Sequence, residues 1–162
     1  MKFLISIFLL LAPASTNLVE TIRIQYPNAS ASAQNSTQLA ESLASISKSD
    51  EPTLVAYKGA SLAIESKFIS NFSTKTTKLK TGVDLIEYAV LNDSSNIEIR
   101  FIRLSIQENL PAIVNYNRNK KEDKIFIVNN LNSQQLPLRE YLKNFIKNSK
   151  SFSAKEVQQL CN

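Results

Sequence analysis

Histidine is absent from the chain, and cysteine occurs once, as Cys161, among 162 residues. Zinc and copper sites therefore lack their usual imidazole and thiolate ligands. Catalytic systems that activate a serine or cysteine through a neighbouring histidine are excluded within this chain for the same reason. An internal disulfide is also excluded. We expect Cys161 to pack as a small apolar residue under the last helix; the alternative is an intermolecular bridge.

Glycine is scarce, with Gly59 and Gly82 as its two occurrences. Loops that cradle phosphates or dinucleotides need clustered glycines, which let backbone amides approach the ligand. With neither such loops nor the usual metal ligands, we expect no cofactor. Gly59 stands beside alanines, and we expect two helices to approach each other closely there, because a larger side chain would block the contact. The alternative is a glycine that is merely tolerated.

The charge balance is modest, with 19 basic and 14 acidic residues and a formal net charge of +5. Basic residues cluster at 75–80 and again at 118–124, where Glu122 and Asp123 interrupt them. The second cluster is therefore expected to be the solvated start of a helix. Aromatic residues do not alternate with these bases, as a surface for single-stranded nucleic acid would require. We predict no nucleic-acid partner.

The first residues have the layout of a secretory signal peptide. Lys2 provides a positive start, an apolar run covers 3–11, and small residues precede an expected cleavage site after Ala14. The apolar run is about half of the roughly 20 residues that span a bilayer, so we expect cleavage and no stable membrane insertion. The prediction is an exported protein, periplasmic or secreted, with a signal peptide at 1–14 and one domain at 15–162. The alternative is a buried N-terminal helix.

Low glycine and proline content and apolar residues three and four positions apart predict helices throughout, with no convincing strand. We expect an all-α fold of about eight helices joined by short turns, which favours antiparallel neighbours. One helix begins near Pro137, with apolar residues on one face: Leu138, Tyr141, Leu142, Phe145 and Ile146. Ser153 and Glu156 predict a capping box for the last helix. Asn119 and Glu122 form a weaker box before a helix at 119–131.

The five earlier helices are expected at 18–22, 39–46, 50–68, 79–90 and 97–110. The segment 27–37 is rich in Ala, Ser and Asn and is predicted to be a loop. The polar stretch 70–77 is predicted to separate the third and fourth helices. Pro111 ends or kinks the fifth, because proline lacks a backbone donor.

Residues 54–104 resemble the helix-turn-helix pattern of tetratricopeptide repeats. The matching positions are Val55, Gly59 and Leu62, the helix end at 87–93 and the helix start at 96–98. The pattern departs from the family in three respects. The predicted loop after Phe68 is too long, no proline follows Asp93, and the helix pairs do not keep the period of about 34 residues. The resemblance implies an irregular stack of helical hairpins.

A second resemblance covers residues 50–157. The runs LVAYKGA at 54–60 and NIEIRFIRLSIQEN at 96–109, with EDK at 122–124 and SFS at 151–153, are similar to an exported helical protein family of Bacteroidota. This resemblance implies an exported helical fold and no particular activity.

The helix expected at 97–110 has two apolar faces. One carries Ile97, Phe101 and Leu104, and the other Ile99, Ile102, Ile106 and Leu110. Two polar strips separate them: Arg100, Arg103 and Gln107 on one side, and Glu98, Ser105 and Asn109 on the other. A helix that is apolar on two sides is packed between neighbours, so we expect it at the centre of the fold.

Glu108 falls in line with Leu104 and Phe101, on an apolar face of this helix. A carboxylate there must pair or take up a proton, because an isolated buried charge is costly. Glu108 either makes a structural ion pair or hydrogen bonds at the helix end, or it lines a groove with Arg100 or Arg103. Such a groove would bind a peptide or a small polar ligand.

The predicted function is that of a non-enzymatic exported domain that binds a protein or peptide, because stacked helix pairs make concave surfaces. The predicted binding residues are Arg100, Arg103, Gln107, Glu108 and Tyr116. This function would be favoured by an open concave face around Arg103 and Gln107. Tyr116 lies either at the rim of such a groove or over a helix end. One alternative is a binder of a small molecule or lipid in a pocket between helices. Another is an enzyme in which Glu108 acts as general acid with Asp84 or Glu87.

Overall fold

The computed structural model describes residues 14–161, and the predicted signal peptide lies outside this part except for Ala14. The described residues form helices and no strand, which confirms the predicted all-α fold. In chain order the helices are α1 (Ala14–Gln25), η1 (Tyr26–Asn28), α2 (Ala33–Ser42), α3 (Pro52–Ser66), α4 (Phe72–Asn92), α5 (Ile97–Asn109), η2 (Ala112–Val114), α6 (Lys120–Asn130), α7 (Leu136–Asn148) and α8 (Ala154–Cys161), where η marks a single 3-10 turn.

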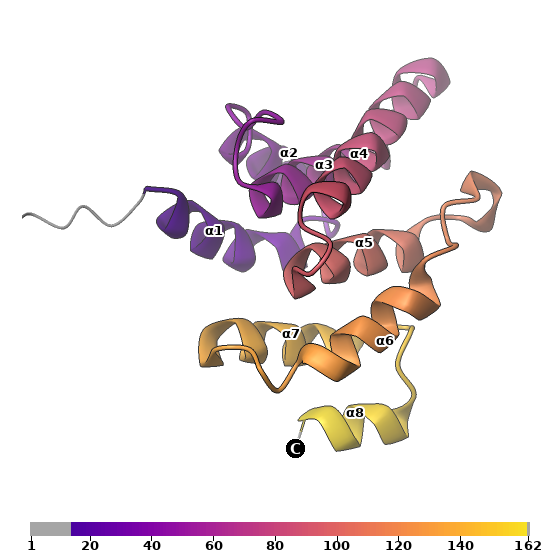
Figure 1. The fold of residues 1–162 in the computed structure, drawn as a ribbon. Coiled ribbons are helices and arrows are strands. Elements are labelled where there is room, and N and C mark those ends of the chain that lie inside the picture. The colour runs from indigo at the N-terminus through magenta and orange to yellow at the C-terminus, as the bar shows by residue number, and fades with distance from the viewer. Residues whose placement is uncertain (1–13, 162) are drawn as a thin grey trace, which may run out of the picture.

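Helix α5 lies at the centre of the molecule (Figure 1). Helices α2, α3 and α4 lie above it in this view, α6 and α7 lie below it, and α8 is lowest. Every side chain of α5 from 101 to 107 is buried, including the polar ones. The expectation of a central helix covered on both sides is therefore confirmed.

Helices α3 and α4 cross in direct backbone contact at Gly59 and Gly82. A Cβ atom added at Gly59 would stand 2.5 Å from the carbonyl oxygen of Gly82, and the reciprocal distance is also 2.5 Å. Real Cβ atoms do not approach backbone oxygens so closely, so both positions require glycine. The predicted close approach at Gly59 is confirmed, and its partner is the other glycine of the chain.

Two predicted loops are wrong because the helices beside them begin earlier. Helix α4 starts at Phe72, where the Asn71 side chain caps it by accepting a hydrogen bond from the Thr74 amide at 3.0 Å. The linker expected at 70–77, and with it the long loop expected after α3, does not exist. Residues 73–77 are polar because the first turns of α4 project beyond the rest of the fold (Figure 1). Helix α2 likewise begins inside the loop expected at 27–37, capped by Ser32.

The capping box predicted at the last helix is confirmed. The Ser153 amide donates to Glu156 Oε2 at 2.8 Å, and the Glu156 amide donates to Ser153 Oγ at 3.4 Å. Glu156 also pairs with Lys124 of α6 at 2.7 Å. The hydrogen bond from Lys124, followed by those from Ser153, lowers the pKa of Glu156 to about 2. The box predicted at Asn119 is incomplete, because its side chain donates to Glu122 but accepts no helix amide.

Replacing Gly59 or Gly82 with alanine is predicted to destabilise the protein. Helix propensity alone would make this change stabilising by about 1 kcal/mol. The clash at the crossing forces the two backbones apart, and overpacking of this kind costs about 1–3 kcal/mol or more. Urea unfolding of each variant measures the effect, with the exposed Ser73→Ala of α4 as the control. Greater stability in either glycine variant would show that the backbones do not touch.

Candidate functional site

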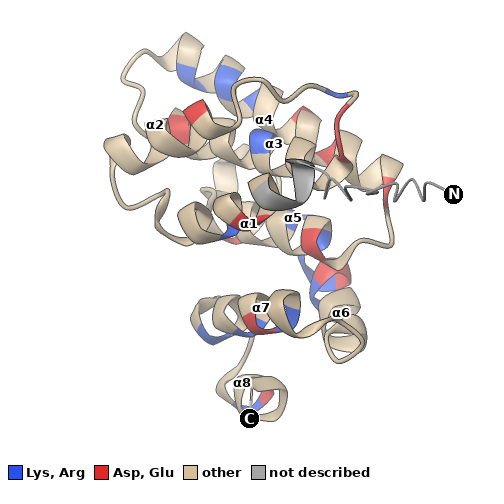
Figure 2. Ribbon diagram, turned by 90° about the vertical axis from the view of Figure 1, so that its left-hand side faces the viewer, with Lys and Arg blue, Asp and Glu red and all other residues tan. Residues whose placement is uncertain are grey.

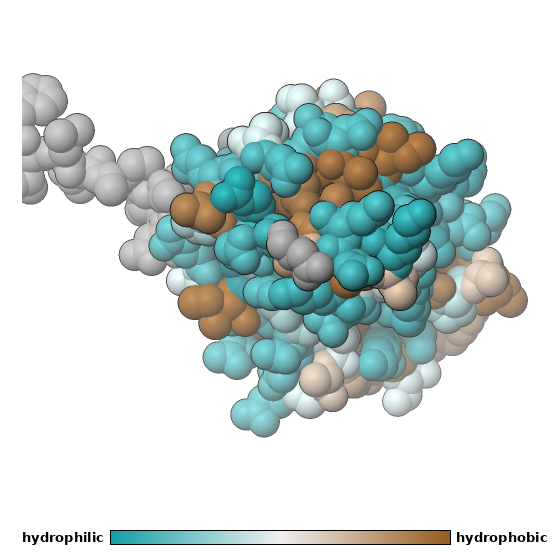
Figure 3. Space-filling model, turned by 90° about the horizontal axis from the view of Figure 1, so that it is seen from below, coloured by the Kyte–Doolittle hydropathy of each residue, from teal (hydrophilic) through white to brown (hydrophobic). Residues whose placement is uncertain are grey.

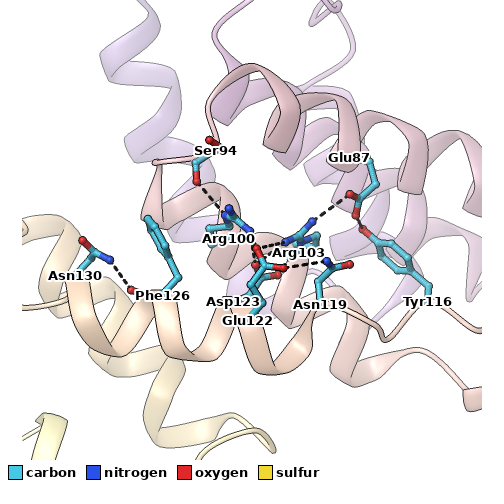
Figure 4. Close-up of polar contacts among 10 residues, drawn as sticks. All are labelled: Glu87, Ser94, Arg100, Arg103, Tyr116, Asn119, Glu122, Asp123, Phe126 and Asn130. Carbon is cyan, nitrogen blue, oxygen red and sulfur yellow. Dashed lines mark hydrogen bonds and ion pairs between the residues drawn. The ribbon is translucent and has the colours of Figure 1, made fainter.

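Arg103 occupies the centre of a buried ion cluster between α4, α5 and α6 (Figure 4). Its Nε and Nη2 atoms donate to the two oxygens of Asp123 at 2.7 and 2.6 Å, and Nη1 donates to Glu87 at 3.1 Å. The Asp123 side chain is fully buried. Burial opposes the charge on Arg103, but the hydrogen bonds and the attraction of both carboxylates outweigh it. They leave the pKa of Arg103 above its ordinary value.

Arg100 and Tyr116 extend this cluster on opposite sides (Figure 4). Arg100 Nη1 donates to Asp123 at 3.0 Å and to Glu122 at 2.6 Å. The Tyr116 hydroxyl donates to Glu87 at 2.6 Å. Burial, and next the hydrogen bond to Glu87, raise the pKa of the Tyr116 phenol well above its ordinary range. The structure therefore brings Arg100, Arg103 and Tyr116 together, but their polar atoms bind carboxylates of the same chain.

Arg103 and Gln107 do not lie on an open face, contrary to the predicted binding surface. These side chains are 3% and 2% exposed. Helix α6 packs against α5, and its Asp123 reaches Arg103. Asp123 was expected in a solvated helix start, since the surrounding run of charges has no local sign of burial. Gln107 differs from the arginines, because neither its amide nitrogen nor its amide oxygen has a hydrogen-bond partner among residues 14–161.

A second buried cluster fixes the other polar side of α5. Glu98 is 3% exposed and accepts hydrogen bonds from Arg23 of α1 at 2.8 and 2.6 Å and from the Tyr57 hydroxyl of α3 at 2.6 Å. The hydrogen bond to Glu98 is the main reason that the pKa of Arg23 is raised. Burial, and next the charge of Glu98, raise the pKa of Tyr57. The sequence placed Glu98 on a polar strip but gave no sign of its partners.

Glu108 is half-buried near the end of α5, where its Oε2 atom accepts hydrogen bonds from the hydroxyls of Ser149 and Ser151 at 2.7 and 2.8 Å. These are hydrogen bonds at the helix end, as the first of the two alternatives for Glu108 predicted. Arg100 and Arg103 bind Asp123 instead. Glu87, one of the two suggested catalytic partners, is held by Arg103 and Tyr116. Of the five predicted binding residues, Arg100, Arg103 and Tyr116 therefore share one cluster, whereas Glu108 lies apart and Gln107 has no polar partner among the described residues.

Two hollows on the described surface adjoin each other, because both are lined by Ser30, Ile64, Ile106 and Asn109. The first, which we call the polar groove, has a volume of about 660 Å³ and is lined in part by Arg23, Glu108, Asn144 and Asn148. The second, the apolar groove, has a volume of about 740 Å³. Its walls are the end of α3, the first half of α4, the end of α5 and the segment around η2.

The apolar groove is lined by Ala63, Ile64, Leu79, Ile106, Leu110 and Val114, among others. Two large apolar side chains of its lining, Phe72 and Ile113, are 81% and 93% exposed. Lys67 and Lys75 also line it, and no Asp or Glu does. The sequence predicted neither groove, since their walls come from segments far apart in the chain.

The rest of the described surface provides weaker candidates for a functional site. The lower face, over α7 and α8, is mostly hydrophilic, and its apolar areas are bordered by hydrophilic residues (Figure 3). Within residues 14–161, no group of His, Cys, Asp or Glu has an arrangement that could hold a metal ion. None of the described helices combines the length and apolar character of a membrane span. Comparison of the chain with models of protein families, with curated proteins and with solved structures finds no match.

Replacing Gln107 with methionine is predicted to leave the free energy of unfolding unchanged or to raise it by about 1 kcal/mol. A buried amide without a partner costs free energy, and methionine fills a similar volume without polar atoms. Chemical denaturation measures the change, with Gln159→Met on the exposed face of α8 as the matched control. A loss of more than about 1 kcal/mol at Gln107 alone would mean that its amide is hydrogen-bonded in the folded protein.

Proposed function

We propose that this protein is a non-enzymatic binding domain that takes up a segment of a partner protein in the apolar groove. The observation that carries the proposal is the exposure of Phe72 and Ile113 beside a hollow with apolar walls. Large apolar side chains left in water around a concave surface are typical of protein interaction sites. Export to the periplasm or beyond, and the resemblance to exported and repeat-like helical proteins, remain parts of the proposal that rest on the sequence pattern.

The two adjoining hollows and the exposed side chains beside them favour a protein segment over a small molecule. The volume of the apolar groove falls in the range of small-ligand pockets, and a small apolar ligand is the second candidate. A small ligand held within the hollow would cover only those parts of Phe72 and Ile113 that line it. An elongated segment can cover both side chains and continue over Asn109 into the polar groove, which adjoins it.

Arg103 and Tyr116, which the sequence predicted to bind a partner, are proposed to position the groove instead. Tyr116 follows η2 closely and is hydrogen-bonded to Glu87 of α4, which is paired with Arg103. This connection ties the η2 wall of the groove to helix α4, which forms another wall. Asn115, between η2 and Tyr116, adopts a left-handed backbone conformation (φ 54°), which asparagine tolerates better than most residues.

The proposal is tested by selecting binders from a library of random 16-residue peptides displayed on phage. We expect the full-length protein to enrich peptides whose affinity falls more than about tenfold in Ile113→Asp, because a charge at an apolar contact must be desolvated. The control is Leu91→Asp, which adds the same charge at a side chain that is 82% exposed. Leu91 lies at the end of α4 that does not line the groove. Failure to enrich peptides, or equal loss in both variants, would contradict the proposal.

A further inference from the structure

The charged side chains that line the apolar groove have one sign. Lys67 follows the end of α3 and Lys75 lies in the first half of α4, and both line the groove. The first half of α4 carries basic positions with no acidic one among them (Figure 2). Along the sequence of that helix, the first acidic residue is Asp84. A ligand in this groove therefore meets positive charge beside apolar surface.

Neither lysine pairs with a carboxylate among residues 14–161. Lys75 is half-buried, and its side-chain ammonium has no hydrogen bond or ion pair to any residue in the described range. Lys67 Nζ donates to the backbone carbonyl of Ser30 at 3.0 Å and lies 5.2 Å from the centre of the Phe68 ring. Lys78, by contrast, is paired with Glu65 at 3.0 Å and does not line the groove.

An ammonium group beside apolar walls attracts an anion more strongly than one in open water, because the local dielectric constant is lower. The apolar walls require an apolar contact at the same time. A segment that satisfies both has apolar residues on one side and carboxylates next to them. An amphipathic helix seated in a groove is a common arrangement of this kind.

We infer that the segment bound by this protein is an acidic amphipathic helix, whose apolar face enters the groove and whose carboxylates pair with Lys67 and Lys75. This inference rests on the proposed function and names the chemistry of its partner. The exposed side chains of Phe72 and Ile113 extend the apolar surface beyond the hollow. A helix is broader than the acyl chain of a lipid and can contact this wider surface.

The test uses two fluorescein-labelled 16-residue peptides with the same leucine face, one with glutamate and one with glutamine at the flanking positions. Fluorescence anisotropy with the full-length protein measures both dissociation constants. We expect the glutamate peptide to bind at least about tenfold more tightly at low salt, and the difference to shrink as salt screens the charges.

Matched variants assign the effect to the groove. Lys75→Gln is expected to weaken binding of the glutamate peptide about fivefold and to leave the glutamine peptide unchanged, and Lys75→Arg to restore binding. Lys80→Gln removes the same charge from an exposed position of α4 that does not line the groove and should have no effect. Circular dichroism of each variant verifies its fold.

Three results would overturn the inference. The two peptides could bind equally, Lys75→Gln could bind like the unaltered protein, or oleate could bind at Lys75 while neither peptide does. If peptides selected from the random library need Ile113 but carry no acidic residues, the proposed function stands and the acidic partner is rejected. If the glutamate peptide binds and Ile113→Asp does not weaken it, the groove itself is rejected.

Discussion

The fold depends on the charges that α5 carries into the interior. Glu98 and Arg103 are each 3% exposed, and a buried charge without a partner would cost several kcal/mol. Each therefore needs a partner from a neighbouring helix: Arg23 of α1 for Glu98, and Asp123 of α6 for Arg103. These pairs connect α5 to helices that precede and follow it in the chain. Apolar contacts tolerate small shifts between helices, whereas paired charges fix their relative positions, and we infer that the pairs specify this packing.

The charged interior also determines the shape of the proposed binding surface. Glu87 lies between Arg103 and the Tyr116 hydroxyl, so the ion cluster reaches the segment that follows η2. Both α4 and η2 form walls of the apolar groove, and the crossing of α3 and α4 at their glycines positions a third. The residues that position the walls of the groove are therefore different from the residues that line it. This arrangement leaves Lys75 and the exposed apolar side chains available to a partner.

Features that depend on neighbours along the chain could be predicted from the sequence. The capping box at Ser153, the central helix at 97–110 and the close approach at Gly59 each follow from a local pattern, and the structure confirms them. Contacts between distant segments could not. Asp123 lies in a mixed run of charges that is typical of a solvated helix, and its burial depends on the packing of α6 onto Arg103. The groove was missed because an exposed apolar residue has the same sequence signal as a buried one.

A double-mutant cycle on the Arg103–Asp123 pair tests the central claim most directly. The free energy of unfolding would be measured by urea denaturation for Arg103→Met, Asp123→Leu and the double variant. If buried charges dictate the packing, each single variant loses about 3–5 kcal/mol, because it leaves the other charge buried and unpaired. The double variant then loses less than either single one. A loss in the double variant equal to the sum of the two single losses would contradict the account.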